Sequence, residues 1–350
     1  MKLNTIEQIF LKLDNPDRFF LIDYLRALAV ITVVLTHFDI IDLYGVGTDL
    51  FFVVSGVLVS RPFLRDFYNS NSTNIKGFYI RRAFKILPSY YFFLFATYLL
   101  FAFFPCVNNE SLTFKLSELP QYLFFYRNYA GPPPRWAFEH TWSLCVEEHF
   151  YLFMPLAFLL LGYFKNFSQK LLLPIIAGLL FIAITIKVLF NIYSFAEYPT
   201  STHNRLDTFL WGILINIILL KHQEVYKLVQ NNKWVLIIGL ILIFLPLFFR
   251  SPNDVHEIYI RCLSPIGITL IVLSFFEYRN SKLKILQLIS FFSYNLYLWH
   301  QPIAKFVICK IGYNFWGGVT YFVASISVAI ITTLLIETTF ISVRERFFSK

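Results

Sequence analysis

Long apolar stretches alternate along this chain with short polar or basic segments. Windows of about 19 residues, the length that crosses a bilayer as a helix, separate ten apolar stretches. They lie at residues 19–38, 48–64, 86–104, 142–163, 171–190, 205–220, 234–250, 262–277, 286–307 and 315–340. The pattern predicts an all-α polytopic membrane protein with about ten transmembrane helices.

The segments between these stretches are short and contain no internal repeat. We therefore expect one membrane domain over residues 1–350, with an N-terminal segment at 1–18 and one long loop at 105–141. The first apolar stretch follows mixed polar residues and has no small-residue cleavage site. We expect it to remain in the protein as a helix and not to be removed as a signal peptide.

The composition supports a membrane protein, and the basic residues predict its orientation. Hydrophobic residues make up 57% of the chain and charged residues only 15%, which excludes an ordinary soluble domain. Lys and Arg are retained in cytoplasmic loops, and most of them fall inside when both termini are cytoplasmic. The 105–141 loop then lies outside. The net charge of +9 reflects this topology and does not indicate a nucleic-acid partner.

The four cysteines fall on or near the outer side in this topology. They are Cys106, Cys145, Cys262 and Cys309. Four cysteines allow three full pairings, and packed free thiols are the alternative, so the sequence leaves disulfide formation open. No Cys or His spacing matches a zinc site, and we expect no metal.

Two ionisable residues lie inside the first apolar stretch, Arg26 and His37. Such residues are costly in a membrane and indicate function. An 11-residue step returns to within about 20° of one helix face and climbs about 16 Å. One face is therefore predicted to carry a cation low and an imidazole high. The alternative is that Arg26 forms an interfacial ion pair with Asp23, three residues earlier.

Polar residues also enter three later stretches. Asp49 and Ser55 belong to the second stretch, two adjacent carboxylates, Glu147 and Glu148, enter the fourth, and His300 lies in the ninth. Neighbouring residues differ by about 100° around a helix. We therefore expect Glu147 to share a face with Ser143 and Tyr151, and Glu148 to point elsewhere.

These residues form two predicted clusters, one in each half of the membrane. A carboxylate beside an imidazole raises the basicity of the ring, as a general base requires, and basic side chains suit a phosphate-rich ligand. A lone intramembrane histidine can instead be a packing residue. The outer cluster holds His37, Asp49, Glu147 or Glu148, Arg205, Asp207 and His300; the inner one holds Arg81, Arg82 and Lys85, with Arg26 between them.

Six segments together resemble the acyltransferase-3 family of integral membrane acyltransferases. The first is Asp23 to Val30 followed by His37, which is similar to the family's Arg-x10-His signature. The others are residues 47–56, 81–90, 142–152, 205–212 and 293–302. They follow one another in the family's order and extend the resemblance over residues 20 to 340.

The resemblance implies an enzyme that moves an acyl group, most often acetyl, from cytoplasmic acyl-CoA to a sugar hydroxyl. The implied acceptors are lipopolysaccharide, peptidoglycan, surface polysaccharides and other free or lipid-linked glycans, and the implied location is the bacterial inner membrane. It implies acyl-CoA as a substrate and no tightly bound cofactor. A small glycosylated acceptor, or a polytopic transporter, is the alternative.

The resemblance also implies roles for individual residues. Catalysis falls to Arg26, His37, Glu147 and Glu148, and donor binding to Arg81, Arg82 and Lys85. Supporting roles fall to Asp49, Ser55, Trp142, Ser143, Tyr151, Arg205, Asp207 and His300. We expect His37 to be the base, oriented by a carboxylate such as Glu147, or to carry the acyl group itself.

Three features depart from the family's pattern. His149 replaces the usual Gln, Glu337 lacks its following Pro, and we expect no esterase-like C-terminal domain. We therefore expect the chain to complete the transfer within the membrane domain.

Overall fold

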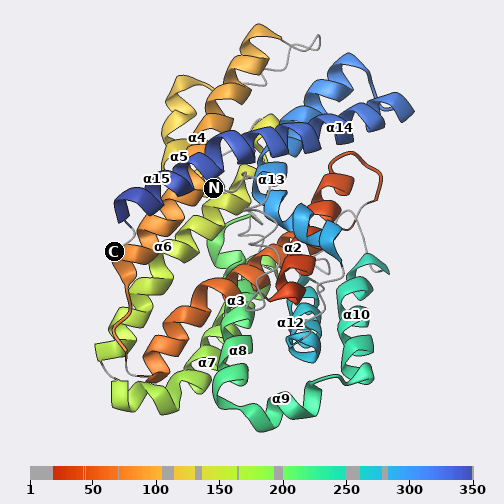
Figure 1. The fold of residues 1–350 in the computed structure, drawn as a ribbon. Helices are drawn as coiled ribbons and strands as arrows, with labels where there is room; N and C mark the ends of the chain where they lie inside the picture. The colour runs from red at the N-terminus through yellow and green to blue at the C-terminus, as the bar shows by residue number, and fades with distance from the viewer. Residues whose placement is uncertain are drawn as a thin grey trace.

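The computed structural model shows an all-helical protein (Figure 1). It describes residues 19–41, 43, 45–69, 71–104, 114–130, 136–163, 165–192, 200–248, 261–277 and 283–348. Within these residues no strand occurs, which confirms the predicted all-α class.

A helix occupies each of the ten predicted stretches. The long helices are α2 (Phe20–Thr36), α3 (Val46–Asn69), α4 (Ile75–Phe103), α6 (Thr141–Tyr163), α7 (Lys165–Ile192), α8 (Leu206–Lys221), α10 (Lys233–Phe248), α12 (Leu263–Phe275), α13 (Lys284–Lys310), α14 (Phe315–Thr332) and α15 (Thr338–Phe348). Short helical pieces join them: η1 (Leu116–Glu118), α5 (Leu119–Leu123), η2 (Arg127–Tyr129), η3 (Trp136–Phe138), η4 (Thr202–Asn204), α9 (Gln223–Val229) and η5 (Thr333–Glu337), which is a π-helix.

Five of these helical segments are long and apolar enough to cross a membrane. They are Val46–Asn69, Ile75–Phe103, Thr141–Tyr163, Gln169–Leu189 and Phe315–Phe348. The pair α9 and α10, bent by 82°, makes a sixth segment if it is counted as one span. These segments confirm a membrane protein, whereas ten crossings and cytoplasmic termini stay predictions.

Helices α3 and α8 approach closely because two glycines face each other. A Cβ on Gly56 would lie 2.5 Å from the Phe209 carbonyl oxygen, and one on Gly212 would lie 2.4 Å from the Val53 carbonyl oxygen. Small residues allow such approach where apolar lipid gives helices little hydrophobic drive to associate. This contact fixes the level of Asp49 and Ser55 on α3 relative to α8.

Helix α4 begins eleven residues before the predicted stretch and so carries the basic segment. Its first turn is capped by the Asn74 side chain, which accepts a hydrogen bond from the Gly77 amide at 2.7 Å. Arg81, Arg82 and Lys85 therefore project from a helix rather than from a loop. Apolar windows alone cannot find this start, because the first three turns are basic.

Helices α14 and α15 form one long helical segment that crosses the molecule and brings the C-terminal end beside α4 (Figure 1). A π-helical stretch joins them. The ring of Phe348 lies 5.5 Å from that of Phe84, which fixes the end of α15 against α4. The last helix thus reaches the basic residues of α4.

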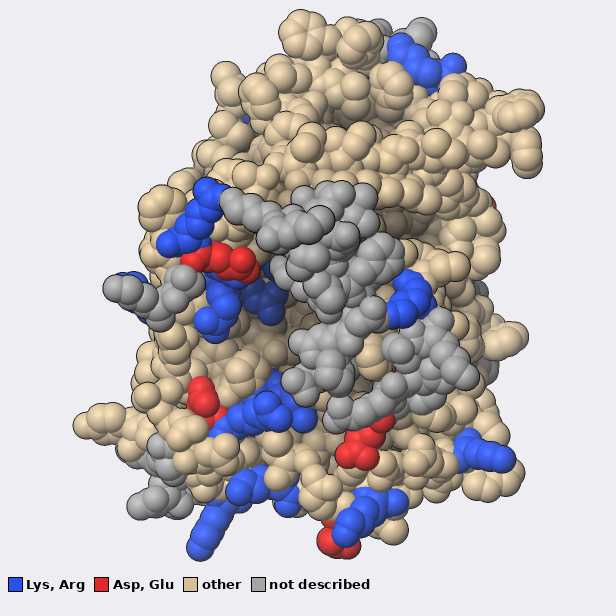
Figure 2. Space-filling model, in the orientation of Figure 1, with Lys and Arg blue, Asp and Glu red and all other residues tan. Residues whose placement is uncertain are grey.

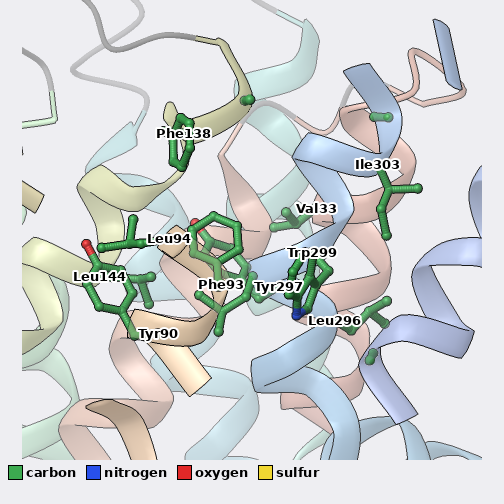
Figure 3. Packing of buried hydrophobic residues seen from close by; sticks show 14 of the residues in the cluster. Val33, Tyr90, Phe93, Leu94, Phe138, Leu144, Leu296, Tyr297, Trp299 and Ile303 are labelled. Carbon is green, nitrogen blue, oxygen red and sulfur yellow. The ribbon is translucent and has the colours of Figure 1, made fainter. Parts of the chain in front are cut away.

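A large aromatic core surrounds α13 (Figure 3). Phe93 of α4 packs edge to face on Trp299 of α13, with ring centroids 5.6 Å apart. Tyr297 and Tyr90 belong to the same buried cluster. Edge-to-face pairs are preferred by aromatic rings, so this core sets the position of α13 between α2 and α4.

The cysteines resolve a question that the sequence leaves open. Cys145 and Cys262 are buried and take part in no disulfide, whereas Cys309 is disulfide-bonded. Cys106 lies outside the described residues. Any pairing that uses Cys145 or Cys262 is therefore wrong.

Candidate active site

A polar cavity of about 350 Å³ opens between α2, α3, α4, α6, α13 and α15. We call it the basic cavity, after the five cationic side chains in its wall: Arg26, Arg81, Arg82, Lys85 and Arg344. The remaining polar side chains are Thr48, Ser55, Ser143, Glu147, Glu148, Tyr151, Tyr294 and Tyr297. It therefore joins the predicted donor-binding residues to one predicted catalytic arginine and both carboxylates.

The carboxylate of Glu147 is held by two hydroxyl groups. Ser55 donates to one carboxylate oxygen at 3.0 Å, and the Tyr151 hydroxyl donates to the other at 3.2 Å. The guanidinium of Arg82 lies over the Tyr151 ring, 4.5 Å from its centroid. As predicted, Ser143, Glu147 and Tyr151 share one face of α6, and that face lines the cavity.

The prediction that Glu148 points away from this cavity is wrong. Both Glu147 and Glu148 line it. The cavity extends around the edge of α6, so two side chains about 100° apart on the helix both reach its wall.

Arg26 also faces the basic cavity. Its guanidinium donates to the Ser293 hydroxyl of α13 at 3.0 Å, while Asp23 accepts from the Ser290 hydroxyl at 3.1 Å. Two serines on consecutive turns of α13 therefore hydrogen-bond to two charged side chains of α2. Arg26 therefore lines the cavity. An ion pair with Asp23 at the membrane surface would not account for this position.

His37 lies apart from the cavity, in a cluster of three imidazoles. We call it the histidine cluster: His37 where α2 ends, His140 just before α6 and His300 on α13. The rings of His37 and His300 are 4.8 Å apart, and those of His140 and His300 are 5.0 Å apart. Both His140 and His300 are fully buried.

Backbone carbonyl groups fix the tautomers in this cluster. Nδ1 of His37 donates to the Val33 carbonyl at 2.9 Å, Nδ1 of His300 to that of Tyr297 at 2.6 Å, and Nε2 of His140 to that of Leu298 at 3.0 Å. A neutral imidazole has a single N–H group. Because this group donates to the carbonyl oxygen, the other ring nitrogen can only accept a hydrogen bond. Nε2 of His300 and Nδ1 of His140 find no partner among the described residues.

Tyr297 separates the two regions. Its side chain lines the basic cavity, while its ring lies 5.4 Å from both His140 and His300. Its hydroxyl hydrogen-bonds to Ser143 and donates to the His140 carbonyl oxygen at 3.1 Å. Phe51 packs on the same ring at 5.6 Å. Tyr297, Ser143 and Phe51 therefore form a wall between cavity and cluster.

A third group of polar residues joins α3, α7 and α8. Arg205 pairs with Asp49 at 3.2 Å, and Lys187 pairs with Asp207 at 2.6 Å, with all four side chains buried. The Arg205 guanidinium lies over Trp142, 5.4 Å from its ring centroid. These contacts fasten the helices on which the cavity residues Ser55 and Glu147 are carried.

The single predicted outer cluster is therefore wrong, because its members divide among three places. Glu147 and Glu148 line the basic cavity, Asp49, Arg205 and Asp207 form ion pairs, and His37 packs edge to face on His300. The expected pairing of His37 with Glu147 is also wrong, because Glu147 binds Ser55 and Tyr151 while His37 binds a backbone carbonyl.

Sequence reasoning missed three residues: His140, Lys187 and Arg344. Lys187 lies within the apolar stretch 171–190, so the rule that singled out Arg26 finds it as well. His140 lies in the predicted loop next to residues 142–152 and carries no periodic signal. Arg344 lies on the last helix, and no spacing in the sequence indicates that α15 packs beside α4.

No group of three or more His, Cys, Asp or Glu residues has the geometry of a metal site in the described parts of the chain. The three histidines face one another through ring edges and are each held by a carbonyl group. Their arrangement suits proton transfer or hydrogen bonding, and the basic cavity suits an anionic ligand.

Comparison with known proteins gives one family and several relatives. The acyltransferase domain model of the acyltransferase-3 family matches residues 20–338. The chain is 28% identical to the O-acetyltransferase OatA of Staphylococcus aureus over 316 residues, which cover 82% of this chain and 50% of that protein. It is 29% identical to the peptidoglycan O-acetyltransferase OatA of Listeria monocytogenes over 350 residues, covering 91% of this chain and 55% of that protein.

No solved structure matches the chain. The chain spans about half the length of these curated relatives. The family model, by contrast, covers the histidine cluster and every lining residue of the basic cavity except Arg344, which lies on α15 beyond the matched residues. The protein therefore belongs to the acyltransferase-3 family, whose model describes an acyltransferase domain, as its six sequence segments predict.

Proposed function

We propose that the protein transfers an acetyl group from acetyl-CoA to a sugar hydroxyl of a surface polysaccharide or lipopolysaccharide. The donor binds in the basic cavity, and His37 acts as the base at the other side of the wall formed by Tyr297, Ser143 and Phe51. The observation that carries this proposal is the joining of five cationic side chains to a buried carboxylate network in one cavity.

The wall of the basic cavity supports a phosphate-bearing donor. Arg81, Arg82, Lys85 and Arg344 supply cations in a region sheltered by helices, where charge-assisted hydrogen bonds to phosphate are strongest. Arg26 lies with Ser143 and Glu147 in the same wall. Its guanidinium is placed to bind the thioester limb and to stabilise negative charge that develops on the carbonyl oxygen.

The tautomer of His37 supports its role as a base. With Nδ1 donating to Val33, Nε2 holds the lone pair that accepts the proton of the attacking hydroxyl. The sugar oxygen forms an ester bond to the acetyl carbon, the carbon–sulfur bond breaks, and the thiolate leaves with the proton that His37 releases. Nδ1 of His140 and Nε2 of His300 have no hydrogen-bond partner among the described residues. They can accept hydrogen bonds that stabilise the proton while it is bound to His37.

The two sites lie at different levels of α2, so the thioester and the base must meet across the wall. Arg26 and His37 are separated by about 16 Å along a straight helix. Tyr297 lines the basic cavity and its ring also contacts both His140 and His300, while Ser143 beside it donates to the His140 carbonyl oxygen at 3.0 Å. We propose that the Tyr297 side chain moves when the acyl limb passes.

Topology and location complete the proposal. We place both termini and the basic cavity on the cytoplasmic side of a bacterial inner membrane, with ten crossings. The disulfide at Cys309 supports this, because disulfides persist in oxidising compartments and Cys309 lies near the end of α13 beyond His300. Peptidoglycan, one of the acceptors that the resemblance implies, is also the glycan in the name of the Listeria relative.

Mass spectrometry of total surface glycans tests this function. The comparison uses cells with the wild-type protein, with His37→Ala, and with no protein. We expect an acetyl mass difference in the wild type only. Equal glycan masses in all three, with the protein inserted in the membrane, contradict glycan acetylation and favour a small acceptor or transport.

A further inference from the structure

A second cavity lies where the first turns of α4 meet the end of α15. Its volume is about 440 Å³. Two of its lining residues, Arg81 and Arg344, also line the basic cavity, so the two spaces adjoin at these side chains. The other main lining side chains are Lys76, Phe347 and Phe348.

The second cavity combines cations with exposed aromatic rings. Lys76 and Arg81 are exposed, and the rings of Phe347 and Phe348 are 76% and 51% exposed. Figure 2 shows Lys and Arg side chains gathered on the face that carries the end of α15. Cations bind phosphate, and exposed aromatic faces stack on nucleobases.

The size of the basic cavity gives a reason for a second subsite. Its volume of about 350 Å³ is at the lower end for small-molecule pockets. A donor with a long thiol-bearing arm and a phosphorylated nucleoside extends beyond such a space. With the arm directed to Arg26, the nucleoside end leaves the cavity past Arg81 and Arg344, where the second cavity begins.

We propose that the second cavity binds the phosphorylated adenosine end of the acyl-CoA donor. Lys76, Arg81 and Arg344 contact its phosphates, and Phe347 stacks on the base. This inference rests on the acyl-CoA donor proposed above and extends it to α15. The last helix then acts as part of the donor site.

Glu345 is the one acidic residue in this wall. Its carboxylate lies 3.1 Å from the Arg344 guanidinium, and its side chain is 55% exposed. A phosphate competes with it for Arg344, and exposure leaves the carboxylate room to turn into solvent. Removal of this charge by Glu345→Gln should therefore tighten donor binding.

Binding measurements with shortened donors test the subsite. The full chain in lipid nanodiscs is titrated with CoA, with 3′-dephospho-CoA and with phosphopantetheine. We compare the wild type with Lys76→Gln and Phe347→Ala, which alter residues of the second cavity only. Arg346→Gln is the matched control, because Arg346 is an exposed cation on α15 that lines neither cavity.

We expect the wild type to bind CoA at least about tenfold more tightly than phosphopantetheine, since each charge-assisted contact to phosphate contributes on this scale. Lys76→Gln should remove most of the preference for CoA over 3′-dephospho-CoA. Phe347→Ala should weaken both nucleotides and leave phosphopantetheine unchanged. The control should match the wild type.

Two results would overturn the subsite, and they differ from failure of the donor itself. Equal binding of CoA and phosphopantetheine by the wild type removes the subsite and leaves the donor proposal in place. Unchanged CoA affinity in both variants also removes the subsite and leaves the donor proposal in place. The exposed rings of α15 would then contact the lipid surface and not a nucleobase. Absence of binding by CoA and acetyl-CoA alike overturns the donor proposal as well.

Discussion

The basic cavity and the histidine cluster lie on the two sides of one tyrosine and differ in almost every physical respect. The cavity lies among six helices and is lined by charged side chains. The cluster buries His140 and His300 and leaves His37 partly exposed, and each of its three rings is hydrogen-bonded to a backbone carbonyl. The first can hold a charged ligand in place, and the second can accept and share a proton.

This difference separates binding from chemistry along a single helix. Arg26 and His37 both belong to α2 or its end, yet only Arg26 lines the cavity. Changes on the cavity side should therefore alter donor affinity, whereas changes in the cluster should alter the transfer step. Each variant below tests that division.

The largest effect is expected for His37→Ala. Loss of a general base lowers the rate of transfer by about 10²–10⁴-fold, while CoA affinity should stay unchanged. Acetyl transfer to isolated glycan and CoA titration in nanodiscs measure the two quantities on one preparation. His222→Ala, at the end of α8 and outside both regions, is the control. Full transfer by the His37 variant would remove its catalytic role.

The next effect concerns the stability of the fold. It involves an ion pair that lies outside both the basic cavity and the histidine cluster. Asp207→Asn leaves the buried Lys187 ammonium without its ion-pair partner at 2.6 Å, which costs about 3–5 kcal/mol. A lower thermal midpoint with unchanged CoA affinity in the surviving folded protein is the expected result. The double variant Asp207→Leu with Lys187→Met should recover much of the loss. A single variant as stable as wild type would show that this pair does not hold α7 to α8.

Charge reversal in the cavity should affect binding more than transfer. Arg81→Glu together with Arg82→Glu replaces attraction to phosphate by repulsion, and CoA affinity should fall by at least about tenfold. Transfer at saturating donor should change less. Arg346→Glu provides the same charge change outside the cavities. Unchanged CoA affinity in the double variant would show that the donor does not bind there.

The smallest effect is expected at the wall. Tyr297→Phe keeps the ring but removes the hydroxyl that hydrogen-bonds to Ser143 and to the His140 carbonyl oxygen. One hydrogen bond of this kind contributes about 1 kcal/mol, so transfer should fall about fivefold, with CoA affinity unchanged. Steady-state rates over a range of donor concentrations separate the two. A larger loss of affinity than of rate would place Tyr297 in the donor site.

Much of the fold could be predicted from the sequence because its signals are local. Apolar windows find a helix in every predicted stretch, and the 3.6-residue period places Ser143, Glu147 and Tyr151 on one face. The start of α4 could not be found this way, because its first turns are stabilised by a cap and by packing rather than by hydropathy.

The sequence predicts which residues are candidates for the site but not which of them lie next to each other. Charge cost identifies Arg26, His37 and the two glutamates from sequence alone. Which of them meet depends on how helices far apart in the chain pack, and no local pattern reports that. His140 reaches His300 only because the segment before α6 folds onto α13.

A structure of the nanodisc-embedded protein with acetyl-CoA bound tests the central division most directly. We predict that the phosphates contact Arg81, Arg82 and Arg344, and that the acetyl group lies between Arg26 and Tyr297 with the histidine cluster beyond it. Acetyl-CoA bound at the His37 side, with the basic cavity empty, would contradict the account.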